Sequence, residues 1–266
     1  MKIASIDIGT NAVKSKIFDT SPTSIKFVEG IRFPIRLGTE VFRSGKITNE
    51  KLDELVKTLR KYKKSFTKKN IKMYEIVATS AFRDTKNSED ARRYVENKIE
   101  HPIRIISGLE EAKLIRFHPK AEIESKKMYV DVGGGSTEIY IYKNGNHIIQ
   151  SFQLGGVRSL LKKDKQEEWK RLNSWLKKQS DLDTLIGLGG NIKAFLNLNC
   201  AKTMSSKKFT AKAEELKQLN IKDKISTYNL ASDRADVIDH ALKIYLNIIS
   251  QLNIKKIKST LSLIHI

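Results

Sequence analysis

Apolar residues recur with two different periods along this chain, one typical of strands and one typical of helices. Runs with a period of two, rich in β-branched residues, indicate strands. They cover residues 2–8, 12–19, 25–37, 74–82, 103–107, 126–132, 136–142, 147–154 and 183–190. Helical spacing of apolar residues predicts helices over residues 48–66, 88–99, 108–118, 167–178, 191–198 and 233–252. Mixing of the two patterns throughout predicts an α/β protein.

Individual residues predict where some of these elements begin, turn or lie at a sheet edge. Thr48 or Asn49 is expected to cap the helix over residues 48–66, and Ser88 the helix over residues 88–99. Pro34 favours an edge position for the run 25–37, because proline donates no ladder hydrogen bond. The segment "KNGN", residues 143–146, predicts a hairpin turn between two strands.

One segment is echoed half a chain later. "SIDIGTN" at residues 5–11 and "YVDVGGG" at 129–135 each consist of a strand, an aspartate, a β-branched residue and a glycine-led turn. Asp7 and Asp131 stand 124 positions apart in a chain of 266 residues. Such a repeat predicts a duplicated domain, with lobes over 1–122 and 123–266 that present their turns to a shared cleft. The last predicted helix, residues 233–252, could pack against the first lobe.

The net charge of the chain indicates which classes of molecule it could bind. Fifty Lys and Arg residues against thirty acidic ones give a formal charge of +20. Such a field attracts nucleic acid, polyphosphate, phosphorylated nucleotides or an anionic membrane. Lysine enrichment on solvated faces is the alternative, and charge alone leaves both open.

Other classes are poorly supported. Cys200 is the only cysteine, which excludes an internal disulfide and a cysteine-rich zinc site. No apolar run approaches the ~18 residues of a membrane span, and the N-terminus turns polar too early for a signal peptide, so a cytoplasmic protein is expected. The five histidines show no metal-ligand spacing, and no G-x-S-x-G elbow presents Ser136 as a nucleophile.

Two Asp–Gly turns suggest phosphate chemistry. Glycine lets backbone N–H groups approach an anion closely, and an aspartate at a strand end can hold Mg²⁺ through water. Either turn alone is better explained by a plain hairpin. Asp7 and Asp131, each ahead of such a turn, make the phosphate interpretation stronger as a pair.

Three further segments have both a functional and a structural interpretation. "GLGGN", Gly187 to Asn191, either binds an anion at a helix start or only turns the chain. Arg83 in "TSAFRD" either clamps a phosphate or pairs with Asp84. The glutamates of "SGLEEA", residues 107–112, are either ordinary first-turn acids or include a general base.

Taken together, these segments resemble the Ppx/GppA family of exopolyphosphatases and guanosine pentaphosphate phosphohydrolases, within the actin-like ATPase superfamily. The matching pieces are "IDIGTNAVK", "VATSAFRD", "IISGLEEAKLI", "YVDVGGGSTEIYIY", "FQLGGVRSL", "IGLGGN" and "DRADVI". The resemblance implies two ribonuclease-H-like lobes with a cleft between them, and hydrolysis of a terminal phosphoanhydride. Guanosine pentaphosphate hydrolysis, or a polyphosphate-binding regulator with weak or no activity, are the alternatives to exopolyphosphatase activity.

The resemblance also implies roles for individual residues. Glu111 matches the base that activates water, and Arg83 a phosphate-binding arginine. Asp131 and Glu138 match carboxylates tied to Mg²⁺, or another divalent cation, and to water positioning, and Asp7 is the equivalent aspartate of the first turn. The implied phosphate-contacting residues are Thr10, Asn11, Gly133, Gly134, Gly135, Ser136, Gly189 and Gly190.

The chain departs from the family pattern at a few positions. Ala12 replaces a common serine, Lys14 an arginine and Asn191 a threonine, and the ending "IKKIKSTLSLIHI" lacks the expected strand and turn. From the resemblance, the expected substrate is polyphosphate or guanosine pentaphosphate. A homodimer is a further possible assembly. No membrane or specific nucleic acid is expected, since no aromatic stacking platform is evident.

Overall fold

The computed structural model describes residues 1–260 and divides the chain into two compact units. The first unit runs from Met1 to Ser107, and the second begins at Gly108. Residues 261–266, with His265 and much of the unusual ending, lie outside the described residues.

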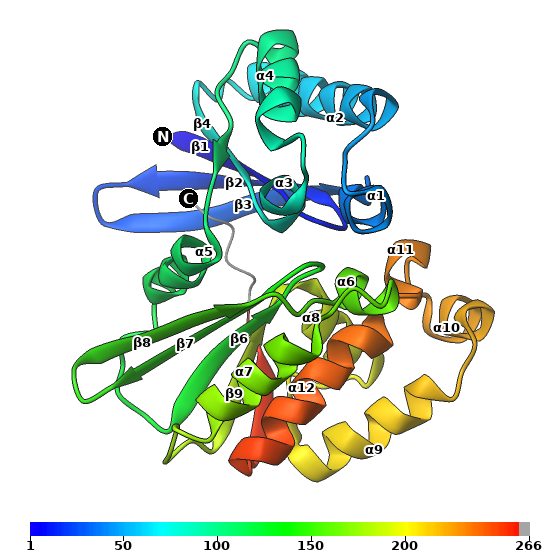
Figure 1. The fold of residues 1–266 in the computed structure, drawn as a ribbon. Coiled ribbons are helices and arrows are strands. Elements are labelled where there is room, and N and C mark those ends of the chain that lie inside the picture. Colours follow the sequence, from blue (N-terminus) through cyan, green and yellow to red (C-terminus); the bar gives the residue numbers. More distant parts are fainter. Residues whose placement is uncertain (261–266) are drawn as a thin grey trace. The chain divides into compact units, whose positions relative to one another are not determined.

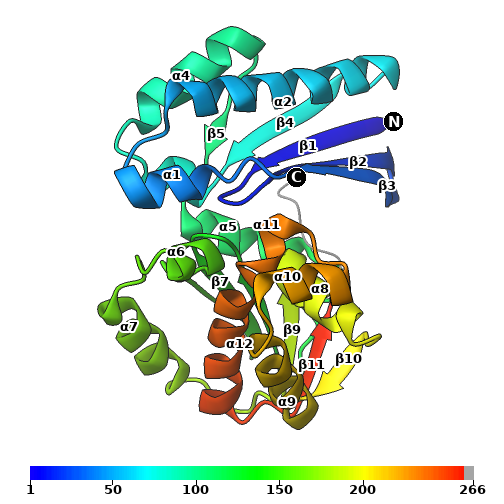
Figure 2. The same ribbon diagram turned by 90° about the vertical axis from the view of Figure 1, so that its right-hand side faces the viewer.

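The first unit is a five-stranded sheet with helices. Its strands are β1 (Lys2–Ile8), β2 (Val13–Ser21), β3 (Ser24–Phe33), β4 (Met73–Ala78) and β5 (Arg104–Ile105). Its helices are α1 (Leu37–Ser44), α2 (Asn49–Lys68), α3 (Ser80–Asp84) and α4 (Ser88–Ile99). The strand order is β3-β2-β1-β4-β5, with β1 antiparallel to β2 and parallel to β4. Helices α2 and α4 lie side by side over one face of this sheet (Figures 1 and 2).

Helix α2 shows how the sequence pattern builds this unit. Its apolar positions at helical spacing are buried, as predicted. The Thr48 hydroxyl accepts a hydrogen bond from Lys51 N at 3.3 Å, which confirms Thr48 as the cap. On the buried side, the Tyr62 hydroxyl donates to Val13 O at 3.0 Å and to Ile31 O at 3.2 Å. This side chain therefore fastens the helix to β2 and β3.

The second unit is a six-stranded sheet. Its strands are β6 (Lys127–Val132), β7 (Thr137–Lys143), β8 (Asn146–Phe152), β9 (Thr184–Leu188), β10 (Thr203–Ser205) and β11 (Lys256–Ser259), in the order β10-β11-β9-β6-β7-β8. Its helices are α5 (Gly108–Leu114), the 3₁₀ helix η1 (Ile115–Phe117), α6 (Gly156–Leu160), α7 (Gln166–Leu176), α8 (Gly189–Leu198), α9 (Ser206–Lys217), α10 (Ile221–Tyr228), α11 (Ser232–Ala235) and α12 (Ile238–Leu252).

The two faces of the second sheet are covered differently. The large core lies between the sheet and helices α7, α8, α9 and α12, and includes Val130, Phe195 and Tyr245. On the opposite face, α5 packs against β7 and β8 (Figure 1). A smaller apolar cluster there joins Ile115, Tyr129, Tyr140 and Leu188, with Ala121.

The two units contain the same arrangement of strands. In both units a three-stranded antiparallel meander continues into a strand parallel to its first member, β1–β2–β3 with β4 and β6–β7–β8 with β9. Asp7 pairs in register with Lys14, and Asp131 with Glu138, 124 residues further along. The α/β class is therefore confirmed, and each unit by itself has the strand order expected of a ribonuclease-H-like lobe.

Some predicted boundaries were wrong. Residues 80–82, predicted as strand, are helical in α3, and Ser88 is the first residue of α4 while Asn87 holds the cap position. The Asn87 side chain is occupied elsewhere, because its amide bridges the backbone of Ile47. The predicted helix over 233–252 is two helices, α11 and α12. Elements without a sequence prediction are α1, α6, α9, α10 and β10. Strand β11 lies in the ending that was expected to lack a strand, so that expectation was wrong.

Helix α12 has a long apolar face, but this face packs into the core of the second unit. It has 15 residues, and its apolar face contributes Ile244, Tyr245 and Ile248 to the core. Along residues 1–260, no helix combines the length and the hydropathy that crossing a bilayer requires.

Buried tyrosines make the fold sensitive to alkali. Burial raises the pKa of Tyr62 and Tyr245, and it raises the pKa of Tyr129 and Tyr140 to about 12. Unfolded tyrosines lose their protons near pH 10, so the free energy of unfolding is expected to fall as the pH rises from about 10 towards 12. Urea unfolding at several alkaline pH values measures this slope.

The Tyr140→Phe variant is the control for this prediction. It removes one of these phenols, with a contribution of at most about 3 kcal/mol at pH 12. The variant should therefore show a shallower loss of stability with pH, whatever its stability at neutral pH. An unchanged slope would contradict the assignment of the effect to Tyr140.

Candidate active site

The two Asp–Gly turns share one backbone hydrogen bond. Gly9 N donates to Ala12 O at 3.1 Å, and Gly133 N donates to Ser136 O at 2.9 Å. In the first turn, the Thr10 carbonyl accepts from Gly38 N at 2.8 Å. In the second, the Gly133 carbonyl accepts from Gly156 N at 3.0 Å. Each turn therefore directs a carbonyl group into the helix that follows the meander.

The glycine loop, Gly133–Gly135, packs against the start of helix α6. A Cβ on Gly155 would come within 2.6 Å of the Gly134 carbonyl, so α6 starts against the loop. Val157 N donates to Gly134 O at 2.8 Å, and the buried Arg158 Nε donates to Gly135 O at 2.8 Å. Within residues 1–260, the amides of Gly134 and Gly135 donate to no protein acceptor. The loop thus has N–H groups available for an anion.

The Asp131 carboxylate lies at the start of helix α8. Gly189 adopts φ of +82°, and a Cβ there would overlap Asp131 Oδ1. A Cβ on Gly190 would come within 2.6 Å of the Arg234 guanidinium. Both glycines therefore allow charged groups to approach the helix start, where N–H groups favour anions.

Glu138 is a buried carboxylate on β7. Its side chain is 1 % exposed, and Ser151 Oγ donates to its Oε1 at 2.9 Å. Register pairs Asp131 with Glu138 and Glu138 with Ser151 across β6, β7 and β8. Directly paired residues of an antiparallel sheet point to the same side, so these three side chains form one row.

Glu111 belongs to the same face of this sheet. It lies on α5, which packs against β7 and β8. One turn later Ile115 contacts the apolar cluster on that face, and residues four apart share a helix side. Glu111 is half-buried, whereas Glu110 is exposed. The structure thus assembles Glu111, Asp131 and Glu138 on one face of the second unit.

The remaining predicted residues lie in the first unit. Asp7 is 6 % exposed, and its Oδ2 accepts a hydrogen bond from Lys14 Nζ at 3.3 Å. The Thr10 hydroxyl is hydrogen-bonded to the Ser80 hydroxyl at the start of α3. Arg83 Nη1 donates to Ile106 O at 2.8 Å. The Thr10–Ser80 contact ties the first turn to α3.

The carboxylates suit a hard cation held together with phosphate. Asp7 Oδ1 is buried, and within residues 1–260 it has no hydrogen-bond partner. No group of three or more His, Cys, Asp or Glu side chains in the described part of the chain could hold a metal ion. Mg²⁺ needs fewer protein ligands than that, since one or two carboxylates together with water and phosphate oxygens complete its coordination. The residues present fit such a site.

Several residues around the site had no assigned role in the sequence. Ser80 stands in "TSAFRD", Arg158 in "FQLGGVRSL" and Arg234 in "DRADVI", so the matching segments already contained them. Arg234 Nη1 donates to Asn191 Oδ1 at 3.2 Å, and Asn191 Nδ2 donates to Val132 O at 3.2 Å. Ser151 had no local signal, because only strand register brings it to Glu138.

Comparisons with known proteins identify a family and a fold for this chain. A family model described as the Ppx/GppA phosphatase family matches residues 16–262. A solved exopolyphosphatase from Cytophaga hutchinsonii superposes with a TM-score of 0.84 at 19 % identity, covering 98 % of this chain and 94 % of that one. The Aquifex aeolicus member of the Ppx/GppA family gives a TM-score of 0.77 at 23 % identity, covering 98 % and 93 %. At such identities the structural matches show the fold.

Proposed function

We propose that this chain, which belongs to the Ppx/GppA phosphatase family, hydrolyses the terminal phosphoanhydride of inorganic polyphosphate and releases orthophosphate. The observation that carries the proposal is a glycine loop with available amides beside two carboxylates, Asp131 and Glu138, with Glu111 on the same face. The named exopolyphosphatase among similar structures and the formal charge of +20 favour a long polyanion as substrate.

The proposed mechanism uses positioning and charge neutralisation, which dominate catalysis of phosphoryl transfer. The amides of Gly134 and Gly135 and the N-terminus of α8 bind the terminal phosphoryl group. Glu111 orients a water molecule and takes its proton as the oxygen attacks phosphorus and the phosphoanhydride P–O bond breaks. Glu138, fixed by Ser151, orients the same water.

The other site residues support the charged substrate. Asp131 is proposed as a ligand of Mg²⁺ in the second unit, where the bound ion would neutralise charge on the phosphate oxygens. Asp7 is proposed as a Mg²⁺ ligand in the first unit. Ser136, Gly189 and Gly190 are proposed as further phosphate contacts. Thr10, Asn11 and Arg83 of the first unit have the same proposed role. A cytoplasmic location and a homodimer stay predictions.

Phosphate release distinguishes the candidate functions. Wild-type protein is expected to release orthophosphate from long polyphosphate in the presence of Mg²⁺ and to stop when EDTA is added. Release from guanosine pentaphosphate should be slower at equal phosphate-end concentration. Faster release from guanosine pentaphosphate would favour that alternative, and tight polyphosphate binding without release would favour the regulator.

A further inference from the structure

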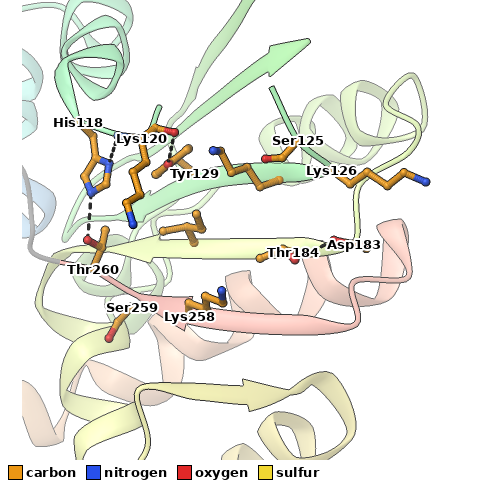
Figure 3. A pocket seen from close by; sticks show the side chains of 12 residues that line it. His118, Lys120, Ser125, Lys126, Tyr129, Asp183, Thr184, Lys258, Ser259 and Thr260 are labelled. Atoms are coloured by element: carbon orange, nitrogen blue, oxygen red, sulfur yellow. Dashed lines mark hydrogen bonds between the residues drawn. The ribbon is translucent and has the colours of Figure 1, made fainter. Parts of the chain in front are cut away.

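A second charged region lies in the second unit, on the sheet face opposite the main core. It is an open pocket of ≈ 600 Å³, bordered by β6, β9, β11 and the segment after η1 (Figure 3). Strand alternation creates it, because Met128, Leu185 and Ile257 point into the core while their neighbours point to the pocket. We call it the lysine pocket.

The lining of the lysine pocket is strongly basic. Lys120, Lys126, Lys127 and Lys258 line it, and none of these ammonium groups forms an ion pair with a carboxylate of residues 1–260. Asp183 supplies a single opposing carboxylate in the described lining, and its Oδ1 already accepts from Thr184 Oγ1 at 2.7 Å. Figure 3 shows Lys120 and Lys258 over the sheet face, while Lys126 extends away from them.

The positive charges crowd one another. Burial and the nearby Lys120 lower the pKa of Lys127. Burial, Lys127 and Lys120 also lower the pKa of His118. A bound anion would relieve this repulsion, so the pocket favours negative charge.

Hydrogen-bond donors accompany the charge. His118 Nδ1 accepts from Lys120 N at 3.3 Å, so the neutral ring carries its proton on Nε2. Nε2 lies 3.0 Å from Thr260 Oγ1 and donates to it. The Thr260 hydroxyl proton is then directed to another acceptor, and Ser125 and Ser259 add hydroxyls to the lining.

We propose that the lysine pocket is a second anion site, which binds the triphosphate chain of a small molecule. Lys127 on β6 and Lys258 on β11 stand on strands separated by β9, about 10 Å apart at the usual strand spacing, a span that a triphosphate chain covers and one orthophosphate does not. The pocket starts at Lys127, four residues before Asp131, which is roughly 13 Å along the strand. It is therefore separate from the candidate active site, and the proposal does not rest on hydrolysis.

Residue-resolved NMR tests this site with inorganic tripolyphosphate, without Mg²⁺. The amide signals of Lys127, Thr184 and Thr260 are expected to shift saturably. Lys120→Gln and Lys258→Gln should each weaken binding about fivefold, and together roughly 25-fold. The matched control is Lys256→Gln, an exposed lysine of β11 outside the pocket lining, which should change the affinity by less than about twofold.

The outcomes separate the sources of the ligand and the two proposals. Equal shifts with ATP would support a nucleotide-borne triphosphate, and shifts with tripolyphosphate alone an inorganic one. Absence of saturable shifts at these amides, or shifts unaffected by the double lysine variant, would overturn the proposal. Repeating the titration with Glu111→Gln protein keeps the tests apart, because that variant removes the proposed hydrolysis and leaves the lysine pocket intact.

Discussion

Glu111→Gln is expected to lower kcat for phosphate release from polyphosphate by about 10²–10⁴-fold with little change in KM. The amide keeps the shape of the side chain but cannot accept a proton. The expected loss equals the usual contribution of a general base. A loss confined to kcat indicates an interaction made in the transition state. Steady-state release of orthophosphate with Mg²⁺ measures both constants.

The neighbouring glutamate supplies a matched control. Glu110 precedes Glu111 on α5 and is exposed, whereas Glu111 is half-buried over the sheet. Glu110→Gln removes the same charge from the same helix turn and should leave kcat within about twofold. Equal activity of wild type and Glu111→Gln would reject Glu111 as the base, and equal losses in both variants would indicate an effect of helix charge.

Long amphipathic elements and the repeat were predictable from the sequence. Helix α2 combines helical spacing with a polar cap at Thr48, and both signals are local. The turns after Asp7 and Asp131 share residue types at a fixed offset, and strand register preserves that offset in the structure. Local pattern and fold agree in these segments, so the sequence sufficed.

Short elements needed tertiary contacts that no local pattern contains. Helix α3 begins where the Ser80 hydroxyl meets Thr10, 70 residues earlier in the chain. Helix α6 begins where Gly156 N and Val157 N donate to the glycine loop. Strand β11 has four residues with only Ile257 buried, too few to establish a period.

The residue types of the candidate site were visible in the sequence, but their partners were not. The pattern "LEEA" offers two glutamates, and only the packing of α5 distinguishes Glu111 from Glu110. Ser151 and Arg234 reach Glu138 and Gly190 through strand register and helix packing, respectively. Such contacts join segments 13 and 44 positions apart, beyond the range of a local motif.

Gly189→Ala is expected to remove most activity by displacing a carboxylate. At φ of +82° an alanine is strained by about 1–2 kcal/mol, and its methyl group would overlap Asp131 Oδ1. Asp131 Oδ1 must then move away from the start of α8. A misplacement of about 1 Å at a reacting group can cost about 10²-fold, so phosphate release should fall at least that far. The Mg²⁺ concentration for half-maximal activity should also rise.

Gly145→Ala separates strain from displacement. Gly145 has a similar φ of +73°, but a Cβ there meets no atom within 4 Å. Both variants should therefore lose a similar free energy of unfolding in urea, while only Gly189→Ala loses activity and Mg²⁺ response. Comparable activity losses in the two proteins would mean that backbone strain, and not the position of Asp131, limits catalysis. Full activity of Gly189→Ala would instead contradict a role for the present position of the Asp131 carboxylate, because Oδ1 has to shift to accommodate the new methyl group.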